Sequence, residues 1–395
     1  MAFLELSRKV SRSGSPALSS LFLSFLKLGA TAFGGPAMVP YIGKMAVEQR
    51  KWLDGDAFRD GVALCQTIPG ATAMQTCAYV GFRVRGVAGA AASFIGFGLP
   101  AFLLMVGLSA AYVRSYTLSP VVAVFNGLQA IIVAILANAA VSFGRTSLKR
   151  LADIMTAMIA AALFGLKVSP ILVVILAALF GLALSGKSAP PNLGIHSNTE
   201  AHRTRPLLIL ASVMALAFAV LFFVERRLFD LAAIMFRIDI FAFGGGFASV
   251  PLMFHEFVEV RSWMDGQTFL NGIALGQITP GPIVITATFV GYILYGLLGA
   301  VVATLGIFLP SFLIVIGVSP YFDRLRRSPR FSKAISAISC SFVGLLLTVT
   351  VRFASNIPWD LPRLFFAVVS FAALLLKVEI IWVVLVGTLV SLLFL

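Results

Sequence analysis

The chain has 395 residues, of which 59% are hydrophobic and 12% charged, and its mean hydropathy is +1.00. A soluble protein keeps a largely polar surface, so this composition excludes a water-soluble globular fold and indicates an all-α polytopic membrane protein. The net charge of +14 is typical of basic cytoplasmic loops, and no soluble domain is present that would bind nucleic acid.

The chain in order begins with a basic segment, residues 1–17, which is predicted to be cytoplasmic. No small-residue cleavage site follows, so the next apolar stretch is predicted to be a span rather than a signal peptide. A polar stretch at 186–205 is predicted to be a linker, and a lone apolar run follows it at 206–224. The apolar segments before the linker lie at about 18–43, 61–82, 87–113, 120–143, 151–166 and 169–185, and those after the lone run at about 228–254, 271–292, 297–319, 334–355, 363–376 and 378–395.

The second series of segments repeats the first at a spacing of 210 or 211 positions. Chance does not align so many rare residues in one register, so we predict two homologous repeats, 18–185 and 228–395, joined by the linker and a connecting span within 206–227. The matched residues include Lys27 with Arg237, Phe33-Gly34-Gly35 with Phe243-Gly244-Gly245, Trp52 with Trp263, Pro69-Gly70 with Pro280-Gly281, and Lys167 with Lys377.

Loop charges predict that the two repeats are inverted. In the first repeat the loops at 83–85 and 145–150 are basic, whereas the loop at 115–119 between them has no Lys or Arg. In the second repeat the counterpart 293–295 is uncharged, and the basic loop is 324–333. If basic loops are cytoplasmic, the repeats face opposite ways. Six spans per repeat and one connecting span give about 13 in total, although the short last two spans of each repeat leave ten to thirteen open.

Glycine and proline interrupt the apolar segments at matching places in the two repeats. Such residues break a membrane helix, and broken helices in inverted repeats are typical of secondary transporters. The N–H groups at a helix start carry partial positive charge and bind anions. The predicted substrate site therefore contains Phe33, Gly34, Gly35, Gln66, Thr67, Pro69 and Gly70 from the first repeat, and Phe243, Gly244, Gly245, Gly246, Gln277, Thr279, Pro280 and Gly281 from the second, with the two glycine breaks close together near mid-membrane.

Lys27 and Arg237 lie at symmetric positions in apolar runs, six residues before each Phe-Gly-Gly. A charge at such a position is costly unless it faces a cavity or a partner, so the two residues are candidates for binding an oxyanion. The alternative is that both side chains snorkel to the membrane interface. Asp239 is predicted to pair with Arg237, and a role as proton carrier is the alternative.

A polar block with a tryptophan follows each glycine break. We favour a salt-bridged loop with an aromatic anchor at the membrane interface, and a gate over the substrate path is the alternative. His255, near the second block, aligns with Lys44 and is predicted to be a polar loop residue. The block residues are Glu48, Arg50, Trp52 and Asp54 in the first repeat, and Glu259, Arg261, Trp263 and Asp265 in the second.

Chemistry other than transport has little support in the sequence. Cys65, Cys77 and Cys340 lie in apolar runs and form no Cys-x-x-Cys pair, so no metal site or cofactor is expected. A membrane-embedded enzyme would need clustered His, Cys or acidic residues, whereas a sensor would usually carry a soluble output domain. We therefore expect a transporter and no enzymatic activity.

The Phe-Gly-Gly-Pro, Glu-x-Arg-x-Trp and Gln-x-x-Pro-Gly motifs and the downstream Leu-Pro together resemble the chromate ion transporter family in its long two-domain form. The resemblance implies export of chromate across the bacterial inner membrane, chromate resistance and coupling to the proton gradient. Sulfate is the structural analogue and the alternative substrate. The sequence leaves open whether the chain acts alone or as a homodimer. Ala71 aligns with Pro282, and Pro36 with Gly246, so the repeats need not contribute equally.

The inverted arrangement is tested by topology reporters. Fusions placed near positions 118 and 328 should report opposite sides of the membrane, because these loops occupy the same place in two repeats of opposite orientation. Reporters that place both positions on the same side would contradict the inversion.

Overall fold

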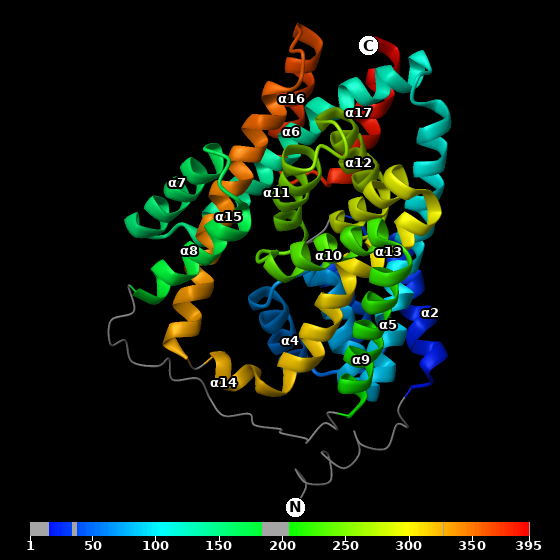
Figure 1. Ribbon diagram of the computed structural model, residues 1–395, viewed down its shortest axis with the longest axis vertical. Helices are drawn as coiled ribbons and strands as arrows, with labels where there is room; N and C mark the ends of the chain where they lie inside the picture. The colour runs from blue at the N-terminus through cyan, green and yellow to red at the C-terminus, as the bar shows by residue number, and fades with distance from the viewer. Residues whose placement is uncertain (1–15, 34–37, 184–204, 327, 395) are drawn as a thin grey trace, which may run out of the picture.

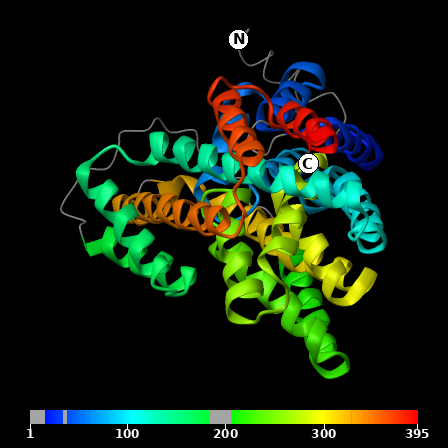
Figure 2. The same cartoon turned by 90° about the horizontal axis from the view of Figure 1, so that it is seen from above.

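The computed structural model describes residues 16–33, 38–183, 205–326 and 328–394 (Figures 1 and 2). Helices form most of this described chain, and no strand occurs in it, as the predicted all-α class requires. Gly34 and Gly35, most of the N-terminal segment and nearly all of the linker lie outside the described residues.

Each predicted repeat contains a corresponding series of helices. The first repeat contains α2 (Leu18–Thr31), α3 (Met38–Gly43) with the π-helical turn η2 (Lys44–Gln49), α4 (Gly55–Thr67), α5 (Thr72–Ser115), α6 (Ser119–Ser147), α7 (Leu151–Gly165) and α8 (Pro170–Ala183). The second contains α10 (Arg226–Phe241), η3 (Gly246–Ala248), α11 (Ser249–Phe254), η4 (His255–Val260), α12 (Gly266–Ile278), η5 (Ile283–Ile285), α13 (Thr286–Val318), η6 (Ser319–Tyr321), α14 (Phe322–Arg326), α15 (Pro329–Ser355), α16 (Leu361–Leu375) and α17 (Ile380–Phe394).

The longest apolar helices are of a size to cross a membrane. Among the described residues, α5, α6, α15 and the stretch Ile283–Tyr321 are long and apolar enough to span a bilayer, and several shorter apolar helices accompany them. The chain is therefore an integral membrane protein. The count of about 13 spans and the inversion of the repeats stay predictions.

The lone apolar run between the repeats forms helix α9 (Arg205–Val224). Its Phe218 and Phe222 make edge-to-face ring contacts with Phe229 of α10. Glu225 accepts a hydrogen bond from the N–H of Arg227, so its side chain caps the start of α10. A direct turn thus joins the connecting helix to the second repeat.

Segments 61–82 and 87–113, predicted as two spans, are divided differently in the structure. α4 ends at Thr67 and α5 begins at Thr72, so the Pro-Gly motif breaks the first segment. The expected loop near position 85 is a sharp bend within α5, where Gly86 has a left-handed φ of 63°. The second repeat has the same bend in α13, where Gly296 has φ 61°. Only glycine adopts this conformation at little cost.

Long helices from the two repeats are packed across each other. α2 packs against α5, α10 packs against α13, and α5 packs against α13 at the centre. The hairpin of α7 and α8 lies against α15 of the other repeat, while α16 and α17 lie against α6 (Figure 1). Each repeat therefore completes its packing with the final hairpin of its partner repeat.

Candidate functional site

Two backbone hydrogen bonds join the broken segments of the two repeats. The N–H of Gly70 donates to the carbonyl oxygen of Ala242 at 2.9 Å, and the N–H of Gly281 donates to that of Ala32 at 3.0 Å. Each bond links the Pro-Gly break of one repeat to the residue just before the glycine break of the other. Gly70 and Gly281 have φ values of 113° and 114°, which strain any residue with a side chain.

The second glycine break lies between the two Pro-Gly breaks. Gly244 and Gly245 have φ values of 110° and 82°. A Cβ on Gly245 would lie 3.1 Å from Oγ1 of Thr72, at the start of α5, and one on Gly246 would lie 2.9 Å from a side-chain carbon of Ile283, at the start of η5. Three helix starts, those of α5, η3 and η5, therefore come together around a glycine backbone.

Asp239 is fully buried and bonded across this junction, not to Arg237 as predicted. The hydroxyl of Ser311, on α13, donates to its Oδ2 at 2.7 Å, and the N–H of Ala71 donates to the same hydroxyl oxygen at 3.0 Å. The other carboxyl oxygen, Oδ1, has no hydrogen-bond partner among the described residues. This carboxyl group thus connects the second repeat to the Pro-Gly break of the first.

The equivalent place in the other half of the molecule is apolar. Gly29 stands where Asp239 would be, Ala101 replaces Ser311, and Pro282, which lacks an N–H, replaces Ala71. A Cβ on Gly29 would collide with the backbone of Phe97, so a carboxylate does not fit there. The backbone arrangement is therefore alike in the two halves, but the side chains at these equivalent positions differ.

Arg237 and Lys27 both have exposed side chains, on α10 and α2. Arg237 forms an ion pair with the buried Glu256, which also binds Arg261. Met45 stands at the position of Glu256 in the first repeat, so Lys27 has no equivalent acid. The two cations are symmetric in sequence but differ in their partners.

Predicted side-chain donors are only partly available. The hydroxyls of Thr67 and Thr279 donate to carbonyl oxygens of their own helices, those of Ala63 and Gly276. These hydroxyls can accept a hydrogen bond but do not donate one to a ligand in this conformation. The two predicted amides also differ, because Gln66 is exposed, whereas Gln277 is buried and its Nε2 lacks a described partner.

The prolines of the two Pro-Gly motifs lie outside the helices. Pro69 lies in the break, three positions before α5 begins, and Pro280 lies in the matching break before η5. Pro282 directly precedes η5 as its N-cap residue. These prolines end the preceding helical segments and leave the helix starts to residues that have N–H groups.

Aspartates of the polar blocks cap helices. Asp54 accepts a hydrogen bond from the N–H of Ala57 at 2.7 Å, and Asp265 from that of Thr268 at 2.8 Å. Partial burial opposes ionisation of Asp265, but the hydrogen bonds from Thr268 outweigh it and hold the pKa below its ordinary value. These two acids start α4 and α12, as a structured loop requires.

Aromatic anchors fix the same blocks to the helices. Trp52 stacks on Phe25 with ring centroids 6.2 Å apart, and Trp263 contacts Phe257 at 5.8 Å. The guanidinium of Arg50 lies over the ring of Trp52, as that of Arg261 lies over Trp263. These contacts agree with the structured-loop interpretation. The gate remains a hypothesis.

Partly buried ion pairs extend from the second block to neighbouring helices. Glu259 pairs with Arg352 of α15 and, at 2.9 Å, with the ring of His255. His255 is thus a buried partner of an acid and not a simple loop residue. Sequence reasoning missed Glu256, Ser311 and Arg352. A signal existed for Arg352, which is a charge within the apolar run 334–355.

The structure has apolar helices that are broken at matching places in the two repeats. These breaks meet at a buried junction, an arrangement that is typical of a polytopic membrane transporter. A family model described as chromate transporter matches residues 19–182 and again 229–392. The chain belongs to the chromate transporter family, as its motifs predicted, and the relatives that it resembles are transporters and not enzymes.

Relatives match over most of their length. An uncharacterised transporter from Methanocaldococcus jannaschii is 41% identical over 96% of this chain and 95% of its own. A chromate transport protein from Cupriavidus metallidurans is 30% identical over 91% of this chain and 88% of its own. Another chromate transport protein, from Pseudomonas aeruginosa, is 30% identical over 89% of this chain and 85% of its own. No solved structure matches the chain.

The bridge made by Ser311 is tested by its removal. Ser311→Ala leaves the N–H of Ala71 and the carboxyl of Asp239 without their partner, so we expect a loss of about 1–3 kcal/mol of stability. Thermal unfolding of the purified protein measures this loss. Ser24→Ala is the control, because the buried hydroxyl of Ser24 has no described partner and its removal should change stability little. Equal stability of both variants would contradict the bridge.

Proposed function

We propose that the protein exports chromate across the plasma membrane and binds the anion where its helix breaks meet. The observation that carries this proposal is the convergence of the α5, η3 and η5 starts around Gly245 and Gly246. Helix starts carry partial positive charge and unpaired N–H groups, so their convergence favours an anion. The absence of Cβ atoms lets the ligand approach the backbone.

Chromate is a tetrahedral dianion with four oxygen acceptors. Backbone N–H groups and Nε2 of Gln277, which has no partner among the described residues, supply donors, and Arg237 and Lys27 supply positive charge along the path. None of these groups forms a covalent bond to the ligand, as release on the other side requires. Sulfate has the same shape and charge, and it is the alternative substrate because these donors do not distinguish the two.

Coupling to the proton gradient is assigned to Asp239. Its Oδ1 is buried without a described partner, whereas Oδ2 is bound by Ser311, so the carboxyl group has one free oxygen for a proton. Export driven by an inward proton gradient requires exchange of the two ions, so Asp239 takes up a proton from outside after chromate has left and releases it inside before the next chromate binds. A carboxyl that bridges the two repeats is well placed to respond to both events.

Export is tested by expression of the protein in a chromate-sensitive bacterium. Energised cells should contain less chromium than empty-vector cells, and Arg237→Gln should reduce export about tenfold at an equal membrane level, since it removes a charge-assisted donor. Glu256 keeps Arg261 as a partner in this variant, so folding should persist. Arg59→Gln, at an exposed ion pair of α4, is the control. Chromium content equal to that of empty-vector cells would overturn the export proposal.

Proton coupling is tested in proteoliposomes. Asp239→Asn keeps an oxygen that can accept from Ser311 but cannot release a proton, so an imposed pH gradient should no longer drive chromate accumulation. Exchange of chromate for chromate should continue, because it needs no net proton movement. Undiminished gradient-driven accumulation in the variant would remove Asp239 from the coupling step.

A further inference from the structure

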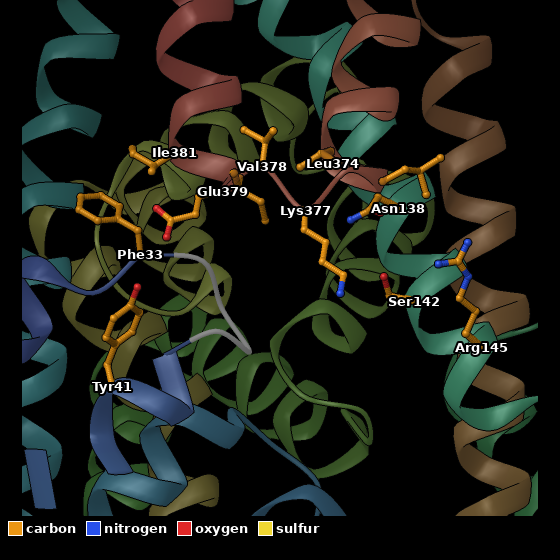
Figure 3. A pocket seen from close by; sticks show the side chains of 12 residues that line it. Phe33, Tyr41, Asn138, Ser142, Arg145, Leu374, Lys377, Val378, Glu379 and Ile381 are labelled. Carbon is orange, nitrogen blue, oxygen red and sulfur yellow. The ribbon is translucent and has the colours of Figure 1, made fainter. Parts of the chain in front are cut away.

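A pocket of about 340 Å³ reaches Phe33 and Tyr41, the described residues that flank the first glycine break in sequence (Figure 3). One wall is α6, a second is the turn between α16 and α17, and the third is formed by Phe33 and Tyr41, which stand on either side of the break. The pocket is therefore built by both repeats. Its polar lining residues are Tyr41, Asn138, Ser142, Arg145, Lys377 and Glu379.

Four of the six polar lining residues are cationic or carry a hydroxyl, and the other six lining residues are apolar. Lys377 extends into the space between Tyr41 and Ser142, and Arg145 follows Ser142 on α6 (Figure 3). Glu379 is the single acid among the lining residues, so two cations are set against one carboxylate. Ammonium, guanidinium and hydroxyl donors in one pocket match an oxyanion that has several acceptor oxygens.

Lys377 holds a backbone conformation that disfavours its own side chain. Its φ is 65°, just after α16 ends, and Lys167 after α7 has φ 64°. Glycine is the usual residue at such a helix end, because a side chain is strained there. Replacement of either lysine by glycine therefore removes the amine and relaxes the backbone, which separates a binding role from a folding role.

The equivalent position in the other half is filled by Arg352. At the repeat spacing of 210 residues, Phe164 and Gly165 correspond to Leu374 and Leu375 of the pocket wall. Nη2 of Arg352 donates to the carbonyl oxygens of Phe164 and of Gly165, the latter at 3.4 Å, and Nη1 pairs with Glu259. The guanidinium thus occupies the place that is hollow in the pocket.

One residue accounts for this difference. Ser142 corresponds to Arg352 at the same spacing, and its short side chain leaves open the space that the arginine occupies in the other half. The two halves share one frame, but one has an open pocket with two cations in its lining, and the other has an arginine side chain paired with an acid.

We propose that this pocket is a loading site, where an oxyanion from one face of the membrane binds to Lys377 and Arg145 before it reaches the glycine break. The proposal rests on the proposed transport function and adds a second binding position to it. The equivalent position of the other half, filled by Arg352, offers no such site.

Equilibrium dialysis of the purified protein in nanodiscs with radiolabelled chromate tests the site. Lys377→Gly should weaken binding about tenfold without loss of thermal stability. Lys167→Gly is the matched control, with the same backbone change outside the pocket, and should bind like the wild type. Glu379→Gln should tighten binding because it removes the single acid. Wild-type affinity in both Lys377→Gly and Glu379→Gln would overturn the loading site.

For Ser142→Arg, the proposal predicts a change in chromate binding opposite to the one expected from charge alone. An added cation would by itself attract an anion, but here the arginine should bind the α16 carbonyl oxygens and fill the pocket, so chromate binding should fall. Tighter chromate binding by this variant would overturn the proposal.

Labelling of Ser142→Cys by a membrane-impermeant thiol reagent gives a readout independent of transport. The native cysteines Cys65, Cys77 and Cys340 are buried, so background labelling should be low. Sulfate, which does not oxidise thiols, should slow the labelling at least severalfold, and Lys377→Gly in the same protein should abolish this protection. Labelling that sulfate leaves unchanged would contradict the site.

Failure of the loading site is distinguishable from failure of the proposed function. If the wild type exports chromate while Lys377→Gly and Ser142→Arg bind and export it normally, the loading site is wrong and the transport function stands. If the wild type neither lowers cellular chromium nor binds chromate, the proposed function itself is wrong.

Discussion

A backbone N–H buried in apolar surroundings must be hydrogen-bonded, and this requirement governs the centre of the molecule. In the described part of the chain, glycine and proline release backbone groups from their helices at Pro69-Gly70, Gly244-Gly245 and Pro280-Gly281. The structure satisfies two of these groups across the repeats, because Gly70 donates to Ala242 and Gly281 donates to Ala32. Each repeat therefore depends on the other for a hydrogen bond at its Pro-Gly break. The crossed packing of α7 and α8 on α15, and of α16 and α17 on α6, is consistent with this mutual dependence.

The two repeats share their backbone arrangement, so the positions where their side chains differ indicate separate roles. Asp239, Ser311 and Ala71 form a polar bridge in one half, where the other half has Gly29, Ala101 and Pro282. Likewise Arg352 fills a space that Ser142 leaves open. The repeats thus share their backbone geometry but carry different polar and charged side chains. Such a difference suits an ion carrier that has one substrate site and one coupling site, because the two sites need different charges.

Local patterns predicted the two repeats, the breaks at Pro69-Gly70, Gly244-Gly245 and Pro280-Gly281, helix α9 and the aromatic anchors of the tryptophan loops, because these depend on residues close in sequence. The aspartate caps of these loops were not predicted. Pairing partners could not be predicted in this way. Asp239 lies two positions from Arg237, but residues so spaced on a helix do not face each other, so Arg237 turns to Glu256 and Asp239 to Ser311. The bends at Gly86 and Gly296 were missed as well, since a bend and a short loop have the same sequence pattern.

Convergence of the breaks on one anion is the central claim. An experimental structure of the protein in chromate, with anomalous scattering recorded at the chromium edge, tests it most directly. We expect a chromium peak within hydrogen-bonding distance of the backbone between Gly245 and the starts of α5 and η5. Chromium that occupies only positions away from this junction, in a protein that transports chromate, would contradict the account.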